Sequence, residues 1–383
     1  ESIAHNIVYG INIFNELDLE AFRRTLEKLV QRHAVLRARF VEVDGQPVQR
    51  IYSNEKDFSF IVEDASSWSE EQIEDRKSRE VYTPFNLETG PIMRVTVLKK
   101  AAQEYTVILA LHHIVTDLWS LAILLHELGE IYTAEVQGGA PNLRPVSAAY
   151  TDTVQWQLEM LASPKGEEHL AYWKERLSGE LPSINLPTDH PRPAELTGRG
   201  GAMTVHLGPE LTQALKALAN QFDSNLFSTL LSAYYTLLYR YTGQTDLLVG
   251  SPKAGRSRKN ALTFGYFINP VILRASLDGE MAFSSLMQQV YRNTQADFQH
   301  DEYPFPLLVE KLHPHRETGN SGLMQVLFSW QKTHRMMDNR IIYALASNEE
   351  SYRFNTGMLS VSALSFRARV SPTALALLVT ESE

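Results

Sequence analysis

The sequence predicts an α/β protein, because segments with helical periodicity alternate with short apolar, strand-like segments in both halves of the chain. At 383 residues, of which 44% are hydrophobic, the chain is long enough to bury a large core and to form two lobes. A stretch rich in proline and glycine, 177–201, separates the two halves and predicts the crossing between lobes. We therefore expect one lobe over 1–176 and a second over 202–383.

The first half begins with a predicted helix and a predicted strand. Asp18 to His33 carries apolar residues at helical spacing, with Asp18 as a candidate N-cap. Val35 to Phe40 alternates in the manner of a strand, and this alternation places Arg37 and Arg39 on one face. Two cations are therefore expected side by side on that strand.

A second strand and helix flank the segment that carries two adjacent histidines. Tyr105 to Leu111 is almost wholly apolar, as in a strand that is covered on both faces. From Leu118 to Tyr132 apolar residues recur at helical spacing. The segment between them, His112 to Asp117, therefore lies at a turn from strand to helix.

Helical and strand-like segments also alternate in the second half of the chain. The sequence contains no short-period repeat and no low-complexity tract. The patterns predict helices near 209–222, 227–241 and 282–299, and strands near 246–250, 264–277, 324–330 and 358–366.

Composition excludes several classes of function. The net charge of −9 argues against binding to nucleic acid, which needs clustered Lys and Arg. The chain has no cysteine, so thiolate nucleophiles, disulfides and Cys-based metal sites are ruled out. No apolar run reaches the roughly 18 residues of a membrane span, and no signal-type segment opens the chain. We expect a soluble, cytoplasmic protein that does not contact a membrane.

The adjacent residues His112 and His113 are the main candidates for chemistry. Successive strand side chains point to opposite faces, so only one imidazole can face a given cavity while the other packs. The exposed one could transfer protons near neutral pH, and in the alternative interpretation both are hydrogen-bonded core residues. Adjacent histidines diverge and no HxxxH or HExxH spacing adds a second ligand, so we expect no metal site.

Asp117 has two interpretations. It directly precedes a helix, where either it or Thr116 can cap the free amides of the first turn. A buried carboxylate at this turn also needs a cationic partner, which Arg37 or Arg39 could supply. In the alternative, both arginines are solvated. The chain contains no GxSxG elbow, P-loop or GxGxxG turn.

The segment from His112 to Ser120 resembles the HHxxxDGxS signature of the condensation domains of nonribosomal peptide synthetases, a family related in fold to chloramphenicol acetyltransferase. Further family motifs are matched in order along almost the whole chain, at 32–37 (RHxxLR), 84–94, 150–156, 250–256, 264–269 and 300–305. The chain is identified as a member of this family on that series.

The resemblance implies a fold and a site. The fold is a pseudo-dimer of two chloramphenicol-acetyltransferase-like lobes that form a V with a central tunnel open at both ends. His113 would lie at its centre and take a proton from the attacking amine or position that amine, with His112 beside it. Asp117 would form a structural ion pair, with Arg37 as the first candidate partner and Arg256 as the second. The resemblance further implies supporting residues at Trp119, Ser120 and Asn269.

The resemblance also implies an activity and its partners. The domain is expected to be an acyltransferase of natural-product biosynthesis that joins a donor acyl or peptidyl thioester to the amine of an acceptor aminoacyl thioester. Both substrates would be held on phosphopantetheine arms of donor and acceptor carrier proteins, next to an adenylation domain. The domain itself is expected to bind no cofactor and, as an excised piece, to be a monomer.

The chain departs from the family pattern at three places. Leu118 replaces the motif glycine, which affects the acceptor side of the tunnel and is compatible with a starter or hybrid type that takes a fatty acyl or polyketide donor. The family's N-terminal motif is absent before Glu1, and Ser371 to Leu375 lacks the expected FDL-like segment. We therefore expect the first lobe to be truncated at its start and the second to be incomplete at its end.

Related functions remain as alternatives. An epimerisation domain carries the same histidines but typically has Ser before Trp, whereas this chain has Trp119 followed by Ser120. A heterocyclisation domain would replace the histidines with aspartate. A non-catalytic member that docks carrier proteins and a free-standing acyltransferase that uses coenzyme A are the other possibilities.

Overall fold

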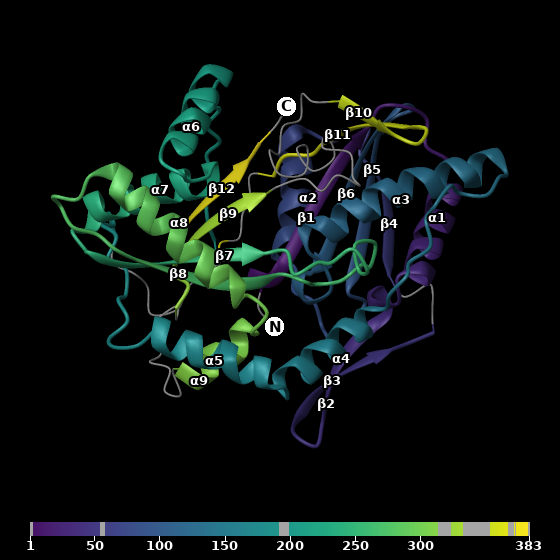
Figure 1. Cartoon of the computed structure of the whole chain (residues 1–383). Helices are drawn as coiled ribbons and strands as arrows, with labels where there is room; N and C mark the ends of the chain where they lie inside the picture. Colours follow the sequence, from purple (N-terminus) through teal and green to yellow (C-terminus); the bar gives the residue numbers. More distant parts are fainter. Residues whose placement is uncertain are drawn as a thin grey trace.

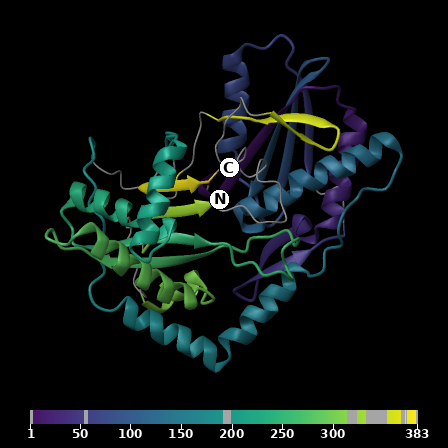
Figure 2. The ribbon, with the colours of Figure 1, turned by 45° about the horizontal axis from the view of Figure 1, so that its top comes forward.

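In the computed structural model, residues 3–53, 58–190, 199–312, 323–331, 353–366, 371 and 373–381 are described. They form a mixed α/β structure in which two sheets lie in separate lobes (Figures 1 and 2). Each lobe has its own large apolar cluster, one built mainly from residues before 133 and the other from residues between 173 and 328. The α/β prediction is confirmed.

The first sheet contains six strands in the order β10-β11-β1-β6-β5-β4. Their bounds are β1 (Asn6–Ile13), β4 (Ser59–Asp64), β5 (Met93–Ala101), β6 (Glu104–His112), β10 (Arg353–Thr356) and β11 (Leu359–Ala363). β6 corresponds to the strand predicted over Tyr105 to Leu111, and it pairs antiparallel with β1 and with β5. Its apolar composition follows from burial of both faces of the sheet, since Val107 belongs to the first apolar cluster and Ile108 to another.

Three helices belong to the first lobe: α1 (Leu19–Arg32), α2 (Glu70–Tyr82) and α3 (Leu118–Gln137). α1 begins as predicted, because the carboxylate of Asp18 accepts from the backbone N–H groups of Glu20 and Ala21. α3 ends at Gly138, which has a left-handed φ of 72°. Both helices contribute buried residues to the first apolar cluster. α3 therefore packs against the sheet that contains β6, the strand that precedes it.

The strand predicted over Val35 to Phe40 is wrong in its first half. Ala34–Arg37 forms a 3₁₀ turn, and β2 (Ala38–Val43) starts only afterwards and pairs with β3 (Gln46–Ile51). The guanidinium of Arg37 donates to the backbone carbonyls of Val30 and Gln31 in the last turn of α1. Those carbonyls lack helical partners, so this contact favours the tight turn, and Arg37 does not share a strand face with Arg39.

The second sheet has the order β12-β9-β7-β8. Its strands are β7 (Asp246–Lys253), β8 (Asn269–Ser276), β9 (Val326–Gln331) and β12 (Leu375–Thr380). The described helices of this half are α6 (Pro209–Gln221), α7 (Leu226–Thr242) and α8 (Phe283–Gln299), close to the predicted bounds, and α9 (Phe305–Leu312), which was not predicted. The strand predicted over 264–277 begins only at Asn269, because 254–268 forms a loop that reaches the first lobe.

Two helices link the lobes: α4 (Tyr150–Leu161) and α5 (Pro164–Arg176). Figures 1 and 2 show them as a bent arm that runs from the first lobe to the second. α4 buries only Met160, whereas Trp173 of α5 belongs to the apolar cluster of the second lobe. The second cluster therefore includes residues that the predicted boundary assigned to 1–176.

The strand predicted over 358–366 lies in the first lobe as β11, although the predicted boundaries placed it in the second. β11 pairs antiparallel with β1, with Ile11 opposite Ala363, and carries β10 at its outer edge. This pairing satisfies backbone groups of β1 that would otherwise form an open edge. The remaining lobe boundaries stay a prediction, and residues 191–198 of the predicted crossing lie outside the described residues.

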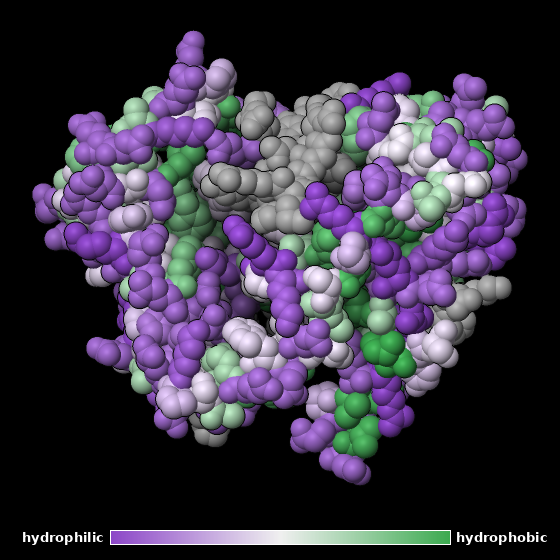
Figure 3. Space-filling view, turned by 45° about the vertical axis from the view of Figure 1, so that its right-hand side comes forward, coloured by the Kyte–Doolittle hydropathy of each residue, from purple (hydrophilic) through white to green (hydrophobic). Residues whose placement is uncertain are grey.

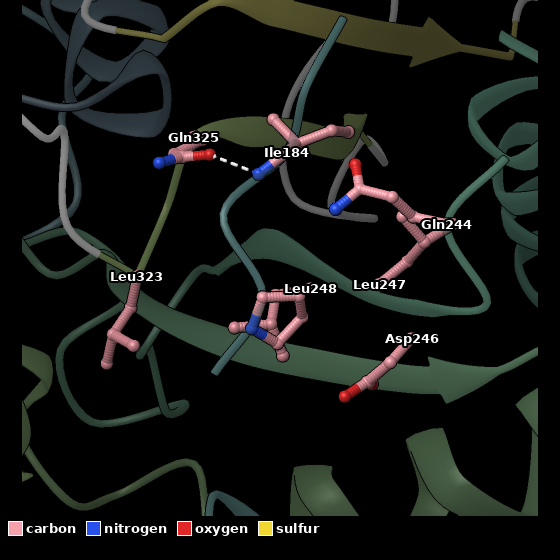
Figure 4. A pocket seen from close by; sticks show the side chains of 8 residues that line it. Ile184, Gln244, Asp246, Leu247, Leu248, Leu323 and Gln325 are labelled. Atoms are coloured by element: carbon pink, nitrogen blue, oxygen red, sulfur yellow. Dashed lines mark hydrogen bonds between the residues drawn. The ribbon is translucent and has the colours of Figure 1, made fainter. Parts of the chain in front are cut away.

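The described part of the crossing is held on the second sheet by two glutamine side chains (Figure 4). The Oε1 of Gln325 accepts from the N–H of Ile184 at 2.6 Å, and that of Gln244 accepts from the N–H of Asn185 at 2.9 Å. They satisfy the backbone as a neighbouring strand would. The small pocket beside them lies within the second lobe, and none of the candidate site residues lines it.

The surface has few large hydrophobic areas on the face that Figure 3 shows, as expected when the apolar side chains are buried in these clusters. The face in Figure 3 is mostly hydrophilic, and its hydrophobic side chains gather in several separate groups. Within the described residues no helix combines the length and the hydropathy of a transmembrane segment.

Candidate active site

The two histidines lie where β6 ends and α3 is about to begin. His112 is the last residue of β6, His113–Val115 forms a 3₁₀ turn, and Asp117 caps α3 by accepting from the N–H of Ser120 at 2.7 Å. The expected turn from strand to helix is therefore present. The chain leaves the end of β6, carries the imidazole of His113 on the turn and enters α3 directly afterwards.

His113 is half-buried, and one of its ring nitrogens has a defined partner. Its Nδ1 lies 2.7 Å from the backbone carbonyl oxygen of Thr116. A carbonyl oxygen only accepts hydrogen bonds, so Nδ1 carries the hydrogen, and the neutral ring has its lone pair on Nε2. The ring also packs edge-on against the ring of Tyr266, with centroids 5.0 Å apart and an interplanar angle of 87°. This tautomer leaves Nε2 as a hydrogen-bond acceptor and base.

His112 has different surroundings. Its Nδ1 accepts from the N–H of Ile114 at 3.2 Å, and its ring packs near the rings of Phe85 and His5. Burial, assisted by the charges of His5 and His113, lowers the pKa of His112 to about 4. His112 is therefore neutral at neutral pH, and its observed contact shapes the turn that carries His113.

Asp117 is paired with Arg256 and not with Arg37. One terminal nitrogen of Arg256 donates to both carboxylate oxygens of Asp117, at 3.0 and 3.2 Å, and both side chains are only 2% exposed. Burial lowers the pKa of Arg256, an effect that the neighbouring Asp117 opposes. Arg37 is occupied at the end of α1, so our first candidate for the partner was wrong and the second was correct.

Arg256 comes from the 254–268 loop, so the ion pair joins the two lobes. Its other terminal nitrogen donates to the carbonyl of Thr263 at 2.7 Å, within the same loop. Its guanidinium carbon lies 4.1 Å from the centroid of the Phe267 ring. These contacts offset part of the free energy that so enclosed a charge loses by leaving water.

Ser120 and Trp119 add further bonds between α3 and the same loop. The hydroxyl of Ser120 donates to the carbonyl of Gly265 at 2.8 Å and accepts from its N–H at 3.0 Å and from Arg256 at 2.7 Å. The indole N–H of Trp119 donates to the carbonyl of Ala261 at 2.9 Å. Both side chains therefore bind the second lobe, and their supporting role in the site stays a prediction.

Asn269 lies in the second lobe, where β8 begins. Its side-chain amide donates to the carbonyls of Asp301 and Tyr303, both at 2.7 Å, and its oxygen accepts from the N–H of Phe305 at 2.9 Å. Asn269 thus organises the 301–305 turn that precedes α9. These three hydrogen bonds all stay within the second lobe, so any support that Asn269 gives to the histidines is indirect.

The sequence reasoning did not assign to the site Tyr266, which borders His113, or Tyr150 and Phe267, which lie next to it. Tyr266 packs on the imidazole, Tyr150 donates through its hydroxyl to the carbonyl of Tyr266 at 2.7 Å, and the N–H of Phe267 donates to Asp117 at 3.2 Å. The apolar pattern assigns 264–268 to a strand instead. The glycine at 265 was the available signal, because a Cβ at that position would collide with the ring of Tyr150.

A model of the condensation-domain family matches residues 1–383. The chain belongs to the condensation-domain family. Its curated relatives include malpibaldin synthetase of Mortierella alpina, 36% identical over 331 residues, and chondramide synthase cmdD of Chondromyces crocatus, 33% identical over 386 residues. The matches cover 85% and 99% of this chain but only 6% and 9% of those synthetases.

Solved structures confirm the two-lobed fold. The condensation domain of the monacolin K polyketide synthase MokA superposes with a TM-score of 0.79 at 18% identity, over all of this chain and 85% of that one. The X-domain from teicoplanin biosynthesis superposes with a TM-score of 0.85 at 20% identity, over all of this chain and 83% of that one. Condensation domains of nonribosomal peptide synthetases are acyltransferases that form amide bonds, so the predicted family and enzyme class are confirmed.

Proposed function

We propose that this condensation domain joins a donor acyl or peptidyl thioester to the amine of an acceptor aminoacyl thioester. Both substrates would arrive on phosphopantetheine arms, one from a donor and one from an acceptor carrier protein, with an adenylation domain as a neighbour in the same synthetase. The observation that carries the proposal is the tautomer of His113, whose Nδ1–H is bound to Thr116 so that Nε2 is available as an acceptor.

The proposed reaction is an aminolysis. The acceptor amine attacks the carbonyl carbon of the donor thioester, a C–N bond forms, the C–S bond breaks, and the donor arm leaves as a thiolate. The proton released by the amine passes to Nε2 of His113 and then to that thiolate. A positioned base contributes about 10² to 10⁴-fold, and alignment of two tethered reactants contributes roughly 7 to 11 kcal/mol.

The remaining residues support this role through geometry. Asp117 and Arg256 fix the start of α3 to the second lobe, and that start lies directly after the turn that carries His113. His112 is kept neutral by burial, which limits the positive charge beside a base that must accept a proton. We therefore assign proton transfer to His113, and positioning to His112 and Asp117.

For the donor, we propose a starter or hybrid type that takes a fatty acyl or polyketide chain. The support is Leu118, a branched side chain in place of the motif glycine, which lies half-buried at the first position of α3 next to the site. A donor panel tests this class: acyl chains should be transferred faster than aminoacyl or peptidyl groups, and a preference for aminoacyl donors would reject it.

The central experiment is detection of the amide product by intact mass on the acceptor carrier protein. The domain within its full-length synthetase is mixed with acyl-loaded donor and aminoacyl-loaded acceptor carriers, as wild type and as His113→Ala. We expect product only with the wild type. Absence of product with the wild type across all donors, together with retained carrier binding, would indicate a docking or epimerising domain. Equal product from both proteins would remove His113 from the mechanism.

A further inference from the structure

The ring of Tyr266 is the second defined contact of the His113 imidazole. One contact is the hydrogen bond from Nδ1–H to the carbonyl of Thr116, which lies in the plane of the ring. The other is the aromatic ring of Tyr266, which meets the imidazole at 87°. A hydrogen bond to one edge leaves the ring free to tilt about that bond, whereas a perpendicular aromatic neighbour restricts the tilt. Together the two contacts define one orientation of the base.

The backbone that carries Tyr266 is held on three successive residues by side chains of α3, its cap and α4. Ser120 bonds both the N–H and the carbonyl of Gly265, Tyr150 bonds the carbonyl of Tyr266, and Asp117 bonds the N–H of Phe267. The position of the Tyr266 ring is thus set across the interface between the lobes. The same α3 start that bonds this backbone also follows the turn that carries His113.

The side chain of Tyr266 has no part in holding its own backbone, since those bonds are made by main-chain atoms and by other residues. Its ring is half-buried beside the catalytic candidate, and its burial and the nearby Asp117 raise the pKa of its hydroxyl, so the group is neutral at working pH. The contact with His113 is made by the ring. A phenylalanine at 266 therefore preserves it, and a leucine does not.

We propose that Tyr266 is a positioning residue that holds the imidazole of His113 in its Nδ1–H tautomer and in one orientation for proton transfer. The inference deepens the proposed function, because it rests on His113 as the base of that reaction. It assigns to the second lobe a share in the active site: the base comes from the first lobe, and the aromatic ring that restricts its movement comes from the 254–268 loop.

The first measurement is kinetic, on the domain within its full-length synthetase with loaded carrier proteins. Tyr266→Leu should lower kcat by about tenfold, as expected for a misaligned catalytic group, with little change in the KM for the acceptor. Tyr266→Phe should restore most of that loss. Tyr239→Leu makes the same chemical change in α7, against the apolar cluster of the second lobe, and controls for general damage to the fold.

The second measurement is independent of turnover. Two-bond proton–nitrogen correlation spectra of the substrate-free domain labelled with ¹⁵N-histidine report the tautomer of each imidazole, and the His113 signals are identified by their absence from His113→Gln. The wild type should show one Nδ1–H tautomer. Tyr266→Leu should show a mixture of tautomers, because a ring that is free to tilt leaves the carbonyl of Thr116, and Tyr266→Phe should return to the single form.

The outcomes separate the two proposals. An unchanged single tautomer in Tyr266→Leu overturns the positioning role, whatever happens to kcat, since a loss of activity would then arise from contact with substrate. A mixed tautomer with reduced kcat, both reversed by phenylalanine, supports it. Full activity of His113→Gln would reject the proposed function instead, while the tautomer spectra still decide whether Tyr266 orients His113.

Discussion

Asp117 performs both of the roles that the sequence left open. Its carboxylate accepts from the N–H of Ser120 as the cap of α3, and the same group is paired with Arg256. A cap alone is worth about 1 kcal/mol, whereas removal of one partner of a buried ion pair costs about 3 to 5 kcal/mol. The ion pair is therefore the larger contribution, although the capping position is what the local sequence predicts.

A pair of substitutions at Asp117 separates the two contributions. Asp117→Asn keeps a good N-cap and removes the charge, so it should lower the free energy of unfolding by about 3 to 5 kcal/mol. Asp117→Ala should cost about 1 kcal/mol more, because it also removes the cap. Urea unfolding measures both.

A double-mutant cycle with Arg256→Met tests whether Arg256 is the partner of Asp117. Because each single variant leaves an unpaired buried charge, the double variant should be less destabilised than the sum of Asp117→Asn and Arg256→Met. Additive losses would show that the two side chains do not interact.

His112 should make the stability of the domain dependent on pH. Its pKa is about 4 in the folded state and near 6.5 when unfolded, so between these values the unfolded chain binds the proton more readily. The contribution of His112 to the free energy of unfolding is therefore fully present above about pH 6.5 and is lost as the pH falls toward 4. Burial lowers the pKa of His5 and His300 in the same direction, so His112 accounts for only part of the decrease.

The contribution of His112 is measured with His112→Asn, whose side-chain oxygen can still accept from the N–H of Ile114. The difference in free energy of unfolding between about pH 6.5 and about pH 4 should be smaller in this variant than in the wild type. His206→Asn, a substitution of an exposed histidine, serves as the control. An equal difference in His112→Asn and wild type would contradict a depressed pKa at this residue.

At the scale of elements, loops determine how the second lobe meets the site. The 254–268 loop leaves β7 and crosses to α3, and β8 starts only at Asn269, whose amide binds three backbone groups of the 301–305 turn. Irregular loops of this kind are held in place by hydrogen bonds to their buried polar groups, as at the terminal nitrogens of Arg256 and the backbone of Gly265. Asn269 is consequently an anchor for the start of α9.

Substitution of Asn269 should loosen that turn before it unfolds the lobe. Asn269→Ala leaves the carbonyls of Asp301 and Tyr303 and the N–H of Phe305 without their partners, at a cost of about 1 to 3 kcal/mol. Hydrogen exchange followed by mass spectrometry should show faster exchange in peptides over 300–308 and unchanged exchange in β1 and β6. Asn142→Ala, at an exposed position, is the matched control. Unchanged exchange over 300–308 would mean that Asn269 is not the anchor.

At the scale of the whole molecule, the lobes are connected by more than the chain that joins them. The hairpin of β10 and β11 extends the first sheet from a late part of the sequence, and the 254–268 loop is bonded to α3 and α4. Each lobe has its own apolar cluster, and the 254–268 loop joins the lobes through these polar contacts and through Phe264, which is buried in the first cluster.

The double variant Ser120→Ala with Tyr150→Phe removes hydroxyls that bridge the lobes without leaving a buried charge unpaired. We expect a larger radius of gyration by small-angle X-ray scattering, because the lobes can separate more widely. Ser232→Ala with Tyr235→Phe removes hydroxyl bonds that lie inside the second lobe and should leave the radius unchanged. The same radius in both variants would show that these hydroxyls do not hold the lobes together.

The sequence by itself determined the α/β class, the places of α1, α3, α6, α7 and α8, the turn from β6 to α3 and the two histidines on it. These follow from local physics: periodicity, caps and the alternation of side chains act over a few residues and are visible in one segment. The motif series along the chain was likewise enough to identify the condensation-domain family.

Only the tertiary structure decided which arginine pairs with Asp117, that β11 joins the first sheet, and that Tyr266 borders His113. Each of these contacts joins residues more than a hundred positions apart. Arg37 is bonded to the carbonyls that end α1, whereas Arg256 reaches Asp117 from the other lobe, and no local pattern shows which distant cation will meet a buried carboxylate. The local sequence therefore placed His113 at the turn, and the packing of two lobes supplied its contact with Tyr266.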